Sequence, residues 1–436
     1  MVDVRPFQGL RYRPSAIGDL SLVISPPYDV VRVDQRGLLY QRSPYNIIRL
    51  EYGLAFPDDT PQDNVYTRAA HLFQRWRSQG VLGQEVLPAF YVLEESFSYQ
   101  GVRRTRRGIL GAVRLEPYET RKIFPHEHTS RAPKEDRLRL LKATRASFSP
   151  ILALYRNGDR LQGLLDRITQ SPPLVEAHGW DDITYRLWAV TDVVMQGAIR
   201  RAFADQPLYL ADGHHRYETA LAYQAVRRGA GSVHPDDAFN FAPMCLVAMD
   251  DSNLAVEAFH RLVAPLPPHL RLALQQAQER VFIQSGVSWP LTISNAQVLL
   301  KGLGGERGVV GFADREQGHL YLLQLRPGVL RDLAPHQALL GCDTWVLHEG
   351  VLWPALGGDR VVYESKVAFV HSLEEVFHGL ASGEASLAYL LRPIPWEVFT
   401  AVVEAGMRLP PKSTYFYPKL PAGLVIYPLE GRLPAP

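Results

Sequence analysis

The hydrophobic positions of the chain follow two periods in turn, one typical of amphipathic helices and one typical of buried strands. Apolar residues spaced three or four apart predict helices at 65–82, 129–146, 161–171, 193–205 and 214–229. Apolar runs predict strands at 89–99, 103–116, 149–155, 183–192, 207–212 and 244–250. Later segments predict a helix that runs into a strand at 273–283 and a hairpin at 309–325. They also predict a strand at 385–392 between two helices, at 372–382 and 396–406. Such alternation indicates an α/β or α+β fold with mixed sheets.

Proline and glycine divide this pattern into many short elements. The segments "SPPYDV" (25–30) and "SPYNIIRLEY" (43–52) predict turns that lead into short strands. The proline-rich segment "LVAPLPPHLR" (262–271) is the best candidate for a linker, because the alternation of helices and strands begins again after it. We therefore expect two domains, at 1–262 and 263–436, which suits a length of 436 residues.

Composition and charge narrow the range of functions. Hydrophobic residues make up 46% and charged residues 21%, which is ordinary for a globular protein. A net charge of +2 does not require nucleic acid or an anionic membrane as a partner. The two cysteines, Cys245 and Cys342, form no disulfide framework, and no apolar run has membrane-spanning length. Because a signal-peptide pattern is also lacking, we expect a soluble cytoplasmic protein.

The stretch "YLADGHHRYET" (209–219) places several reactive side chains on one strand-to-helix turn. Asp212 ends the strand, Gly213 permits a tight turn, and His214, His215 and Arg216 open the helix. A helix N-terminus offers free N–H groups and positive partial charge to an anion, and Asp212 could hold a metal ion or a substrate hydroxyl. In the alternative interpretation Asp212 only caps the helix, and the histidines face solvent or the core.

A second cluster lies in "IFPHEHTSR" (123–131), where Glu127 stands between His126 and His128 just before a helix. A carboxylate there could act as a general base or bind magnesium. The two histidines are two apart rather than four, so the helical zinc pattern is not met. On their own, two solvated loop histidines remain the more frequent interpretation of such a pair.

A third cluster lies in "LPPKSTYFYPKLPAGL" (409–424). Lys412, Ser413 and Thr414 combine an ammonium group with two hydroxyls in a proline-flanked loop, a composition that suits a phosphate. Taken alone, this segment is more typical of a surface turn.

Together these segments resemble known families. Over its whole length the chain resembles a bacterial and archaeal family called domain of unknown function 1015, through "RPFQGLRY", "PPYDV", "PYNIIRLEYG", "PHEHT", "SPILALY", "ADGHHRYETA" and "PKSTYFYPKLPAGL". Its core resembles the archaeal free-serine kinases of the partition-protein-B/sulfiredoxin superfamily. Those kinases carry a Pro-His-Glu segment, a Gly-His-His-Arg turn and a Pro-Lys-Thr-Thr loop, and "PHE", "ADGHHR" and "PPKST" occur here in the same order.

The resemblance implies a partition-protein-B/sulfiredoxin-like nucleotide-binding core with an extra N-terminal segment, followed by a C-terminal α/β domain that contributes the "PKST" loop. It implies a kinase that phosphorylates the hydroxyl of free L-serine or a similar metabolite, with Mg²⁺ and with ATP or ADP as donor. The implied roles are a base at Glu127, magnesium or acceptor binding at Asp212, and nucleotide phosphate binding at 213–216. His126, Lys412, Ser413 and Thr414 would hold the acceptor or its phosphate, and we expect Glu127 and Asp212 to line one cleft.

Departures from the kinase pattern keep other functions open. About a hundred N-terminal residues have no counterpart in the serine kinase, and the third motif lacks the kinase's Arg-His pair. His214 occupies the position of the sulfiredoxin cysteine, which argues against repair of sulfinic acids. The alternatives are a nucleotide-binding clamp or regulatory module of the partition-protein-B type, and a phosphatase that uses the same phosphate site.

Overall fold

The computed structural model describes residues 2–156, 158–180, 182–231, 233–303, 308–329, 333 and 336–435. The chain forms two compact units. Unit 1 comprises Met1–Pro125, Thr129–Ala255 and Pro418–Pro436, and unit 2 comprises His126–His128 and Val256–Tyr417. The domain boundary expected at 262/263 stays a prediction, because compact units and independently folding domains are different properties.

A nine-stranded sheet organises unit 1, in the order β6-β11-β8-β12-β5-β4-β10-β9 with β1 paired to β5. Its strands are β1 (Val4–Arg5), β4 (Phe90–Tyr99), β5 (Val102–Arg114), β6 (Ile123–Phe124), β8 (Ile151–Tyr155), β9 (Val175–His178), β10 (Thr184–Val190), β11 (Leu208–Asp212) and β12 (Phe241–Ala248). β11 runs parallel to β6 and β12 parallel to β8, while the remaining pairs are antiparallel. The prediction of an α/β fold with mixed sheets is therefore confirmed.

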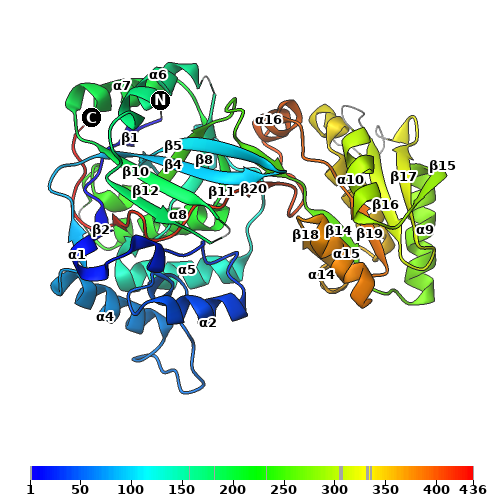
Figure 1. Ribbon diagram of the computed structural model, residues 1–436, viewed down its shortest axis with the longest axis horizontal. Coiled ribbons are helices and arrows are strands. Elements are labelled where there is room, and N and C mark those ends of the chain that lie inside the picture. Colours follow the sequence, from blue (N-terminus) through cyan, green and yellow to red (C-terminus); the bar gives the residue numbers. More distant parts are fainter. Residues whose placement is uncertain are drawn as a thin grey trace. The chain divides into compact units, whose positions relative to one another are not determined.

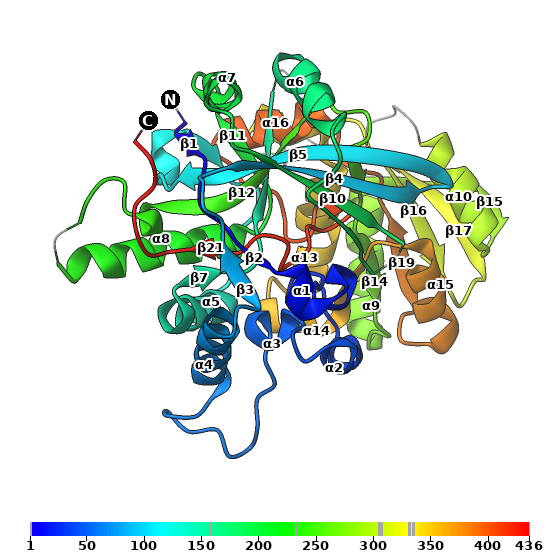
Figure 2. The ribbon, with the colours of Figure 1, turned by 60° about the vertical axis from the view of Figure 1, so that its left-hand side comes forward.

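Helices cover both faces of this sheet. The helices of unit 1 are α1 (Pro14–Ile17), α2 (Val33–Arg42), α3 (Ile48–Glu51), α4 (Val65–Ser78), α5 (Arg131–Thr144), α6 (Asp159–Thr169), α7 (Val193–Phe203) and α8 (His214–Gly229), with 3₁₀ turns η1 (Leu20–Leu22), η2 (Tyr118–Thr120) and η3 (Ala238–Asn240). In Figures 1 and 2, α6 and α7 lie on one face, and α8, α5 and α4 on the other. α6 buries Leu161, Leu165 and Ile168, which share one helical face and join the core of the sheet.

Two predicted strands of the N-terminal segment are wrong. The turn at 25–30 leads into helix α2, which begins at Val33, rather than into a short strand. The strand expected within 43–52 is instead the single helical turn α3. The side chain of Asn46 accepts a hydrogen bond from the backbone N–H of Ile48 at 3.0 Å, which starts a turn rather than an extended strand. Ile47, Ile48 and Leu50 are buried, so tertiary packing overrides the strand preference of the two isoleucines.

The C-terminal segment returns to unit 1 after the chain has built unit 2. Its short strand β21 (Tyr427–Pro428) pairs with β7 (Ala146–Ser147), and β2 (Leu10–Tyr12) pairs with β3 (Leu82–Gln84). Ile426 also bridges to Leu10. The two termini lie side by side in both views (Figures 1 and 2), and the carbonyl of Pro434 accepts a hydrogen bond from Arg5. Both ends of the sequence are thus built into one unit.

Unit 2 is an antiparallel sheet with helices, in the order β15-β17-β16-β19-β14-β18. Its strands are β13 (Ala255–Glu257, which begins in unit 1), β14 (His260–Val263), β15 (Phe282–Pro290), β16 (Val309–Asp314), β17 (His319–Leu325), β18 (Val367–Val370), β19 (Leu387–Leu390) and β20 (Tyr415–Tyr417). Its helices are α9 (Pro268–Val281), α10 (Ile293–Gly302), η4 (Gln337–Gly341), α12 (Asp343–Leu347), η5 (His348–Leu352), α13 (Trp353–Ala355), α14 (Arg360–Lys366), α15 (Leu373–Ser382) and α16 (Trp396–Glu404). Across the part of the chain that is described, no helix has the length and hydropathy needed to cross a bilayer.

A buried ion pair ties the returning C-terminal segment to the sheet of unit 1. Arg106 on β5 and Glu95 on β4 are 0% and 1% exposed, and Arg106 Nη2 donates to Glu95 Oε2 at 2.6 Å. The same Nη2 donates to the carbonyl of Pro418 at 2.8 Å. Burial raises the pKa of Glu95, although Arg106 favours its ionised form. Removing Arg106 would therefore leave the buried carboxylate of Glu95 without its cation and the carbonyl of Pro418 without this hydrogen-bond donor.

We expect Arg106→Met to lower the free energy of unfolding by about 3–5 kcal/mol, because breaking a buried pair leaves one charge uncompensated. Urea unfolding followed by circular dichroism measures the change. Arg103→Met is the matched control on the same strand, since Arg103 is half exposed and its exposed pair is worth about 0.5 kcal/mol. Equal losses for the two variants would show that the buried pair does not anchor the fold.

Candidate functional site

The turn between β11 and α8 is formed as the sequence predicts. The five residues of β11 are buried, and its register against β8 shifts between Leu210 and Asp212. Gly213 has φ 90°, the left-handed conformation that favours glycine, and α8 begins at the next residue. A Cβ at Gly213 would lie 2.9 Å from Arg216 Nε, so glycine also provides the space for that guanidinium.

Asp212 is ion-paired with two cations. Its Oδ2 accepts a hydrogen bond from Arg216 Nη2 at 2.5 Å, and its Oδ1 accepts one from Lys419 Nζ. Burial alone would raise the pKa of Asp212, but Lys419 and Arg216, with a smaller contribution from His214, hold that pKa well below its usual range. Asp212 is therefore an ionised counter-ion that fixes two cationic groups in place.

Arg216 is a buried cation whose Nε–H group has no acceptor among the described residues. Its residue is 9% exposed, and its Nη1 donates to the carbonyl of Pro150 at 2.5 Å. Its Nε is buried and has no hydrogen-bond partner among the described residues. Burial alone would lower the pKa of Arg216, but the acids near it, Asp212 first, hold that pKa above its usual value. A charged donor left without an acceptor at a helix N-terminus favours an anionic ligand.

His215 connects α8 to the loop before α5. Its Nε2 accepts a hydrogen bond from the backbone N–H of Ser130 at 3.1 Å. Thr129 and Lys134 both donate to Glu218, at 2.5 and 2.9 Å. The predicted phosphate-binding role of His215 stays a prediction, while its observed contact holds the 129–130 loop against the helix.

The sequence analysis did not identify a cluster of polar side chains near Arg216, formed by Tyr28, Glu51, Arg137 and Ser149. Arg137 of α5 donates to the backbone carbonyl of Glu51 at 2.6 Å and lies over the ring of Tyr28 at 4.1 Å. Ser149 donates to the buried carboxylate of Glu51 at 2.9 Å. Tyr28 and Glu51 come from the segments interpreted only as turns and strands. Glu51 follows Ile47, Ile48 and Leu50, which was a weak sign of a buried acid, whereas Tyr28 beside Asp29 gave no such sign.

A small cavity of about 40 Å³ lies beside this cluster. Polar side chains of Glu51, Arg137, Ser149 and Arg216 line it, together with apolar groups that include Phe148. Its volume suits a few water molecules and is too small for a nucleotide. We therefore interpret the cavity as part of the packing around Arg216 and not as a nucleotide site.

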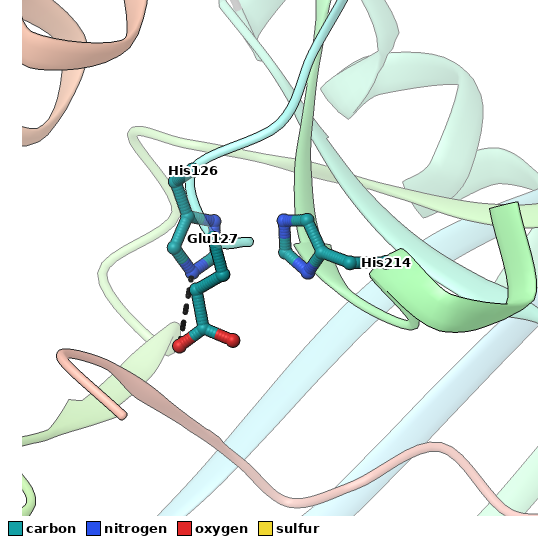
Figure 3. A group of neighbouring side chains, drawn as sticks. All are labelled: His126, Glu127 and His214. Atoms are coloured by element: carbon teal, nitrogen blue, oxygen red, sulfur yellow. Dashed lines mark ion pairs between the residues drawn. The ribbon is translucent and has the colours of Figure 1, made fainter. Parts of the chain in front are cut away.

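In unit 2, the "PHE" and "PKST" segments are in contact. His126 is 1% exposed, and its Nε2 shares a 2.9 Å hydrogen bond with Thr414 Oγ1. The backbone N–H of Leu409 donates to the carbonyl of His126 at 2.8 Å. His126 Nε2 also lies 3.9 Å from Glu127 Oε1, and Figure 3 draws this ion pair, together with His214, the first residue of α8.

Arg261 supports these two segments from within unit 2. It is 1% exposed and donates to the carbonyls of Phe259 and Pro411, at 2.8 and 3.3 Å. Burial lowers the pKa of Arg261 to about 10, although Tyr363 and Glu127 favour its charged form. Arg261 was not singled out from the sequence, because its contact with the third cluster is to Pro411, which lies 150 residues further along the chain.

The remaining residues of the third cluster make contacts inside unit 2. Ser413 is 1% exposed, and its hydroxyl donates to the carbonyl of Pro410 at 2.6 Å. Lys412 has φ 55°, and its Nζ lies 5.5 Å from the ring centroid of Phe259. Roles for Lys412, Ser413 and Thr414 in acceptor binding stay predictions.

The structure thus brings together the predicted residues in two groups. Asp212, Gly213, His214, His215 and Arg216 form the turn of unit 1, joined by Lys419, which the sequence analysis did not select. His126, Glu127, Lys412, Ser413 and Thr414 belong to unit 2. The expectation that Glu127 and Asp212 line one cleft stays a prediction.

Comparison with known proteins places the chain in a family. The model for the family described as "Protein of unknown function (DUF1015)" matches residues 4–341, more than three quarters of the sequence. The chain belongs to this family. The match confirms the family resemblance found in the sequence. The matched range includes the Asp212–Arg216 turn and ends before Lys412 and Lys419. No curated protein matches the chain.

Several solved structures are similar to the chain at low identity. A free serine kinase variant in complex with AMP is 12% identical with a TM-score of 0.36, covering 71% of this chain and 87% of that one. A conserved hypothetical protein from Pyrococcus furiosus is 12% identical with a TM-score of 0.36, covering 73% and 94%. SbnI from Staphylococcus aureus, with a C-terminal truncation, is 13% identical with a TM-score of 0.36, covering 70% and 82%. Similarity at this level transfers neither activity nor ligand to this chain.

We expect Gly213→Ala to lower the free energy of unfolding by about 1–3 kcal/mol, because a Cβ at this φ is strained and presses on Arg216 Nε. Gly229→Ala, at the other end of the same helix, has nothing within 4 Å of its added Cβ and should be neutral or slightly stabilising. Thermal unfolding of the two variants measures the difference. A Gly213→Ala protein as stable as the Gly229→Ala protein would contradict the proposed constraint.

Proposed function

We propose that this protein is a nucleotide-dependent phosphotransferase that phosphorylates the hydroxyl group of free L-serine or a similar small metabolite. The donor would be ATP or ADP, held by its phosphates at the 213–216 turn. The resemblance of the motif order to that of free-serine kinases supports this choice of reaction. The proposal also includes the predicted roles of Glu127 as base and of the 412–414 loop as acceptor site.

The unpartnered Nε–H of Arg216 is the observation that carries the proposal. Arg216 and Lys419 both pair with the carboxylate of Asp212, so two cationic groups lie side by side at this turn. The N-terminus of α8 adds positive partial charge at the same place. Buried polar groups are normally hydrogen-bonded, and a phosphate group would provide the acceptor that Arg216 Nε lacks among the described residues.

Phosphoryl transfer asks mainly for positioning and for stabilisation of negative charge. Arg216 is held by Asp212 and by the carbonyl of Pro150, so its donors are fixed before a ligand arrives. Such preorganised donors stabilise developing charge without rearrangement during the reaction. In this scheme Glu127 would accept the proton of the acceptor hydroxyl, whose oxygen would attack the terminal phosphorus of the donor. The bond from that phosphorus to the bridging oxygen would break, and ADP (from ATP) or AMP (from ADP) would leave.

Magnesium would accompany the nucleotide, whose phosphate oxygens are ordinary ligands for this ion. The described contacts of Asp212 do not suit a direct magnesium ligand, because both of its carboxylate oxygens already accept from cations. They suit a counter-ion for the two phosphate-binding groups. The magnesium role predicted for Asp212 stays a prediction.

Incubation of the purified protein with Mg²⁺, L-serine and either ATP or ADP, followed by phosphorus NMR, tests the proposal. The expected result is O-phosphoserine, or the phosphate ester of another compound when a panel of small hydroxyl metabolites replaces serine. Nucleotide turnover only when DNA is added would favour a clamp. Release of phosphate from O-phosphoserine without nucleotide would favour a phosphatase, and no turnover under any of these conditions would contradict all three.

We expect Glu127→Gln to lower the rate of phosphoryl transfer by about 10²- to 10⁴-fold, the usual contribution of a positioned general base. Nucleotide affinity should stay unchanged, because the phosphates would be held at 213–216. Steady-state kinetics and calorimetric titration with ADP measure the two quantities. Glu374→Gln, an exposed acid at the start of α15, is the matched control. Near-normal transfer by Glu127→Gln would remove Glu127 from the chemistry.

A further inference from the structure

The loop that carries the third cluster is fixed to the rest of unit 2 at several points. The backbone N–H of Leu409 donates to the carbonyl of His126 at 2.8 Å, and Thr414 Oγ1 shares a 2.9 Å hydrogen bond with His126 Nε2. Between these residues, the carbonyl of Pro411 accepts from the buried Arg261 at 3.3 Å. The shape of the loop is therefore set before any ligand arrives.

The side chains of this loop are used in maintaining that shape. Ser413 Oγ donates to the carbonyl of Pro410 at 2.6 Å, and Thr414 Oγ1 is bonded to His126. The ammonium group of Lys412 lies 5.5 Å from the ring centroid of Phe259, within the range of a cation–π contact. Groups that already have partners are poor candidates for the main contacts of a ligand.

The backbone N–H groups of Lys412 and Ser413 donate to no acceptor among the residues that the structure describes. Lys412 is exposed, so water can accept from its N–H. Ser413 is only 1% exposed, and buried backbone N–H groups are nearly always hydrogen-bonded in proteins. An acceptor supplied by a ligand would satisfy this N–H group.

The backbone of the loop changes hand between Pro411 and Lys412. The proline ring fixes a negative φ at Pro411, whereas Lys412 has φ 55°, a left-handed conformation that is uncommon for residues other than glycine. Such a change turns successive N–H groups toward one side, and the resulting concavity binds anions in many proteins. Pro411 and Lys412 are exposed, so the loop is open to solvent on their side.

We propose that the N–H groups of Lys412 and Ser413 bind a carboxylate of the acceptor, so that the acceptor is a hydroxy acid or hydroxy amino acid and not a neutral alcohol. The inference rests on the proposed phosphotransferase and specifies the substrate class that its 412–414 loop selects. Two adjacent donors match the two oxygens of a carboxylate. The transferred phosphate is the other oxyanion with suitable chemistry, and inorganic phosphate as a probe distinguishes the two.

Calorimetric titration of the full chain, with and without AMP, compares acids with their amides. The probes are L-serine, L-threonine, D-glycerate and L-lactate, each against its own carboxamide. We expect at least one acid to bind about 10-fold more tightly than its amide, because charge-assisted hydrogen bonds are roughly twice as strong as neutral ones. A panel in which no acid binds more tightly than its amide would overturn the inference. Binding of inorganic phosphate but of no acid would assign the loop to the transferred phosphate and overturn it as well.

Substitutions at Lys412 separate the main chain from the ammonium group. Lys412→Asn keeps both N–H groups and tolerates the left-handed conformation, so binding of the preferred acid should stay within about threefold. Lys412→Pro removes one N–H group and excludes a positive φ, and should weaken acid binding by about 10- to 100-fold and amide binding by much less. Lys301→Met, at an exposed lysine of α10, is the control. Equal losses in Lys412→Asn and Lys412→Pro would assign binding to the ammonium group and overturn the main-chain site.

An ester bond in place of the peptide bond before residue 413 tests the buried donor itself. Ser413→Ala is the reference, and the α-hydroxy analogue of alanine at the same position replaces only its N–H by oxygen. We expect the ester protein to bind the preferred acid about 10-fold more weakly than Ser413→Ala does. Equal affinities of these two proteins would overturn the inference. Circular dichroism of each variant verifies that it is folded.

The outcome also distinguishes this inference from the proposed function. A preference for an acid that is lost in Lys412→Pro, without phosphoryl transfer to any probe, would retain the carboxylate site and refute the phosphotransferase. Transfer to amides or neutral alcohols with the same kcat/KM as to acids would retain the phosphotransferase and overturn the inference.

Discussion

The carboxylate of Asp212 determines where two buried cations stand. Arg216 follows it by one helical turn, whereas Lys419 arrives from the last segment of the chain. Their charges hold the pKa of Asp212 well below its usual range despite burial, so the carboxylate stays ionised. Two cations pair with this one carboxylate, and the buried Nε of Arg216 still lacks an acceptor among the residues described. An anion is the ligand that we propose for this donor.

Much of unit 1 supports that corner. Arg106 and Glu95, paired inside the sheet, fix the carbonyl of Pro418 and with it the approach of Lys419. Gly213 provides a left-handed turn and leaves space for the guanidinium of Arg216. Within unit 2, His126 and Thr414 join two further motifs by one buried hydrogen bond, and Arg261 supports them.

The sequence was informative where a signal is local. The helix at 214–229, its glycine turn and the strand before it follow from apolar spacing and turn chemistry, and the structure has them at those positions. The strand expected within 43–52 was wrong because the Asn46 side chain initiates a helical turn that the isoleucines alone do not indicate. Lys419 was missed because its partner lies 207 residues away. A lysine among buried Phe416, Leu420 and Ala422 was the available sign of a buried cation.

NMR observation of the Arg216 Nε–Hε group is the most direct measurement of the central claim, that this donor binds a phosphate oxygen. The signal can be assigned by its loss in Arg216→Lys, and then followed during titration with ADP and with pyrophosphate. A new charge-assisted hydrogen bond should move the proton resonance downfield and slow its exchange with water, with the same midpoint as calorimetric binding. An Arg216 resonance that stays unchanged while ADP saturates the protein would place the phosphates elsewhere and contradict the claim.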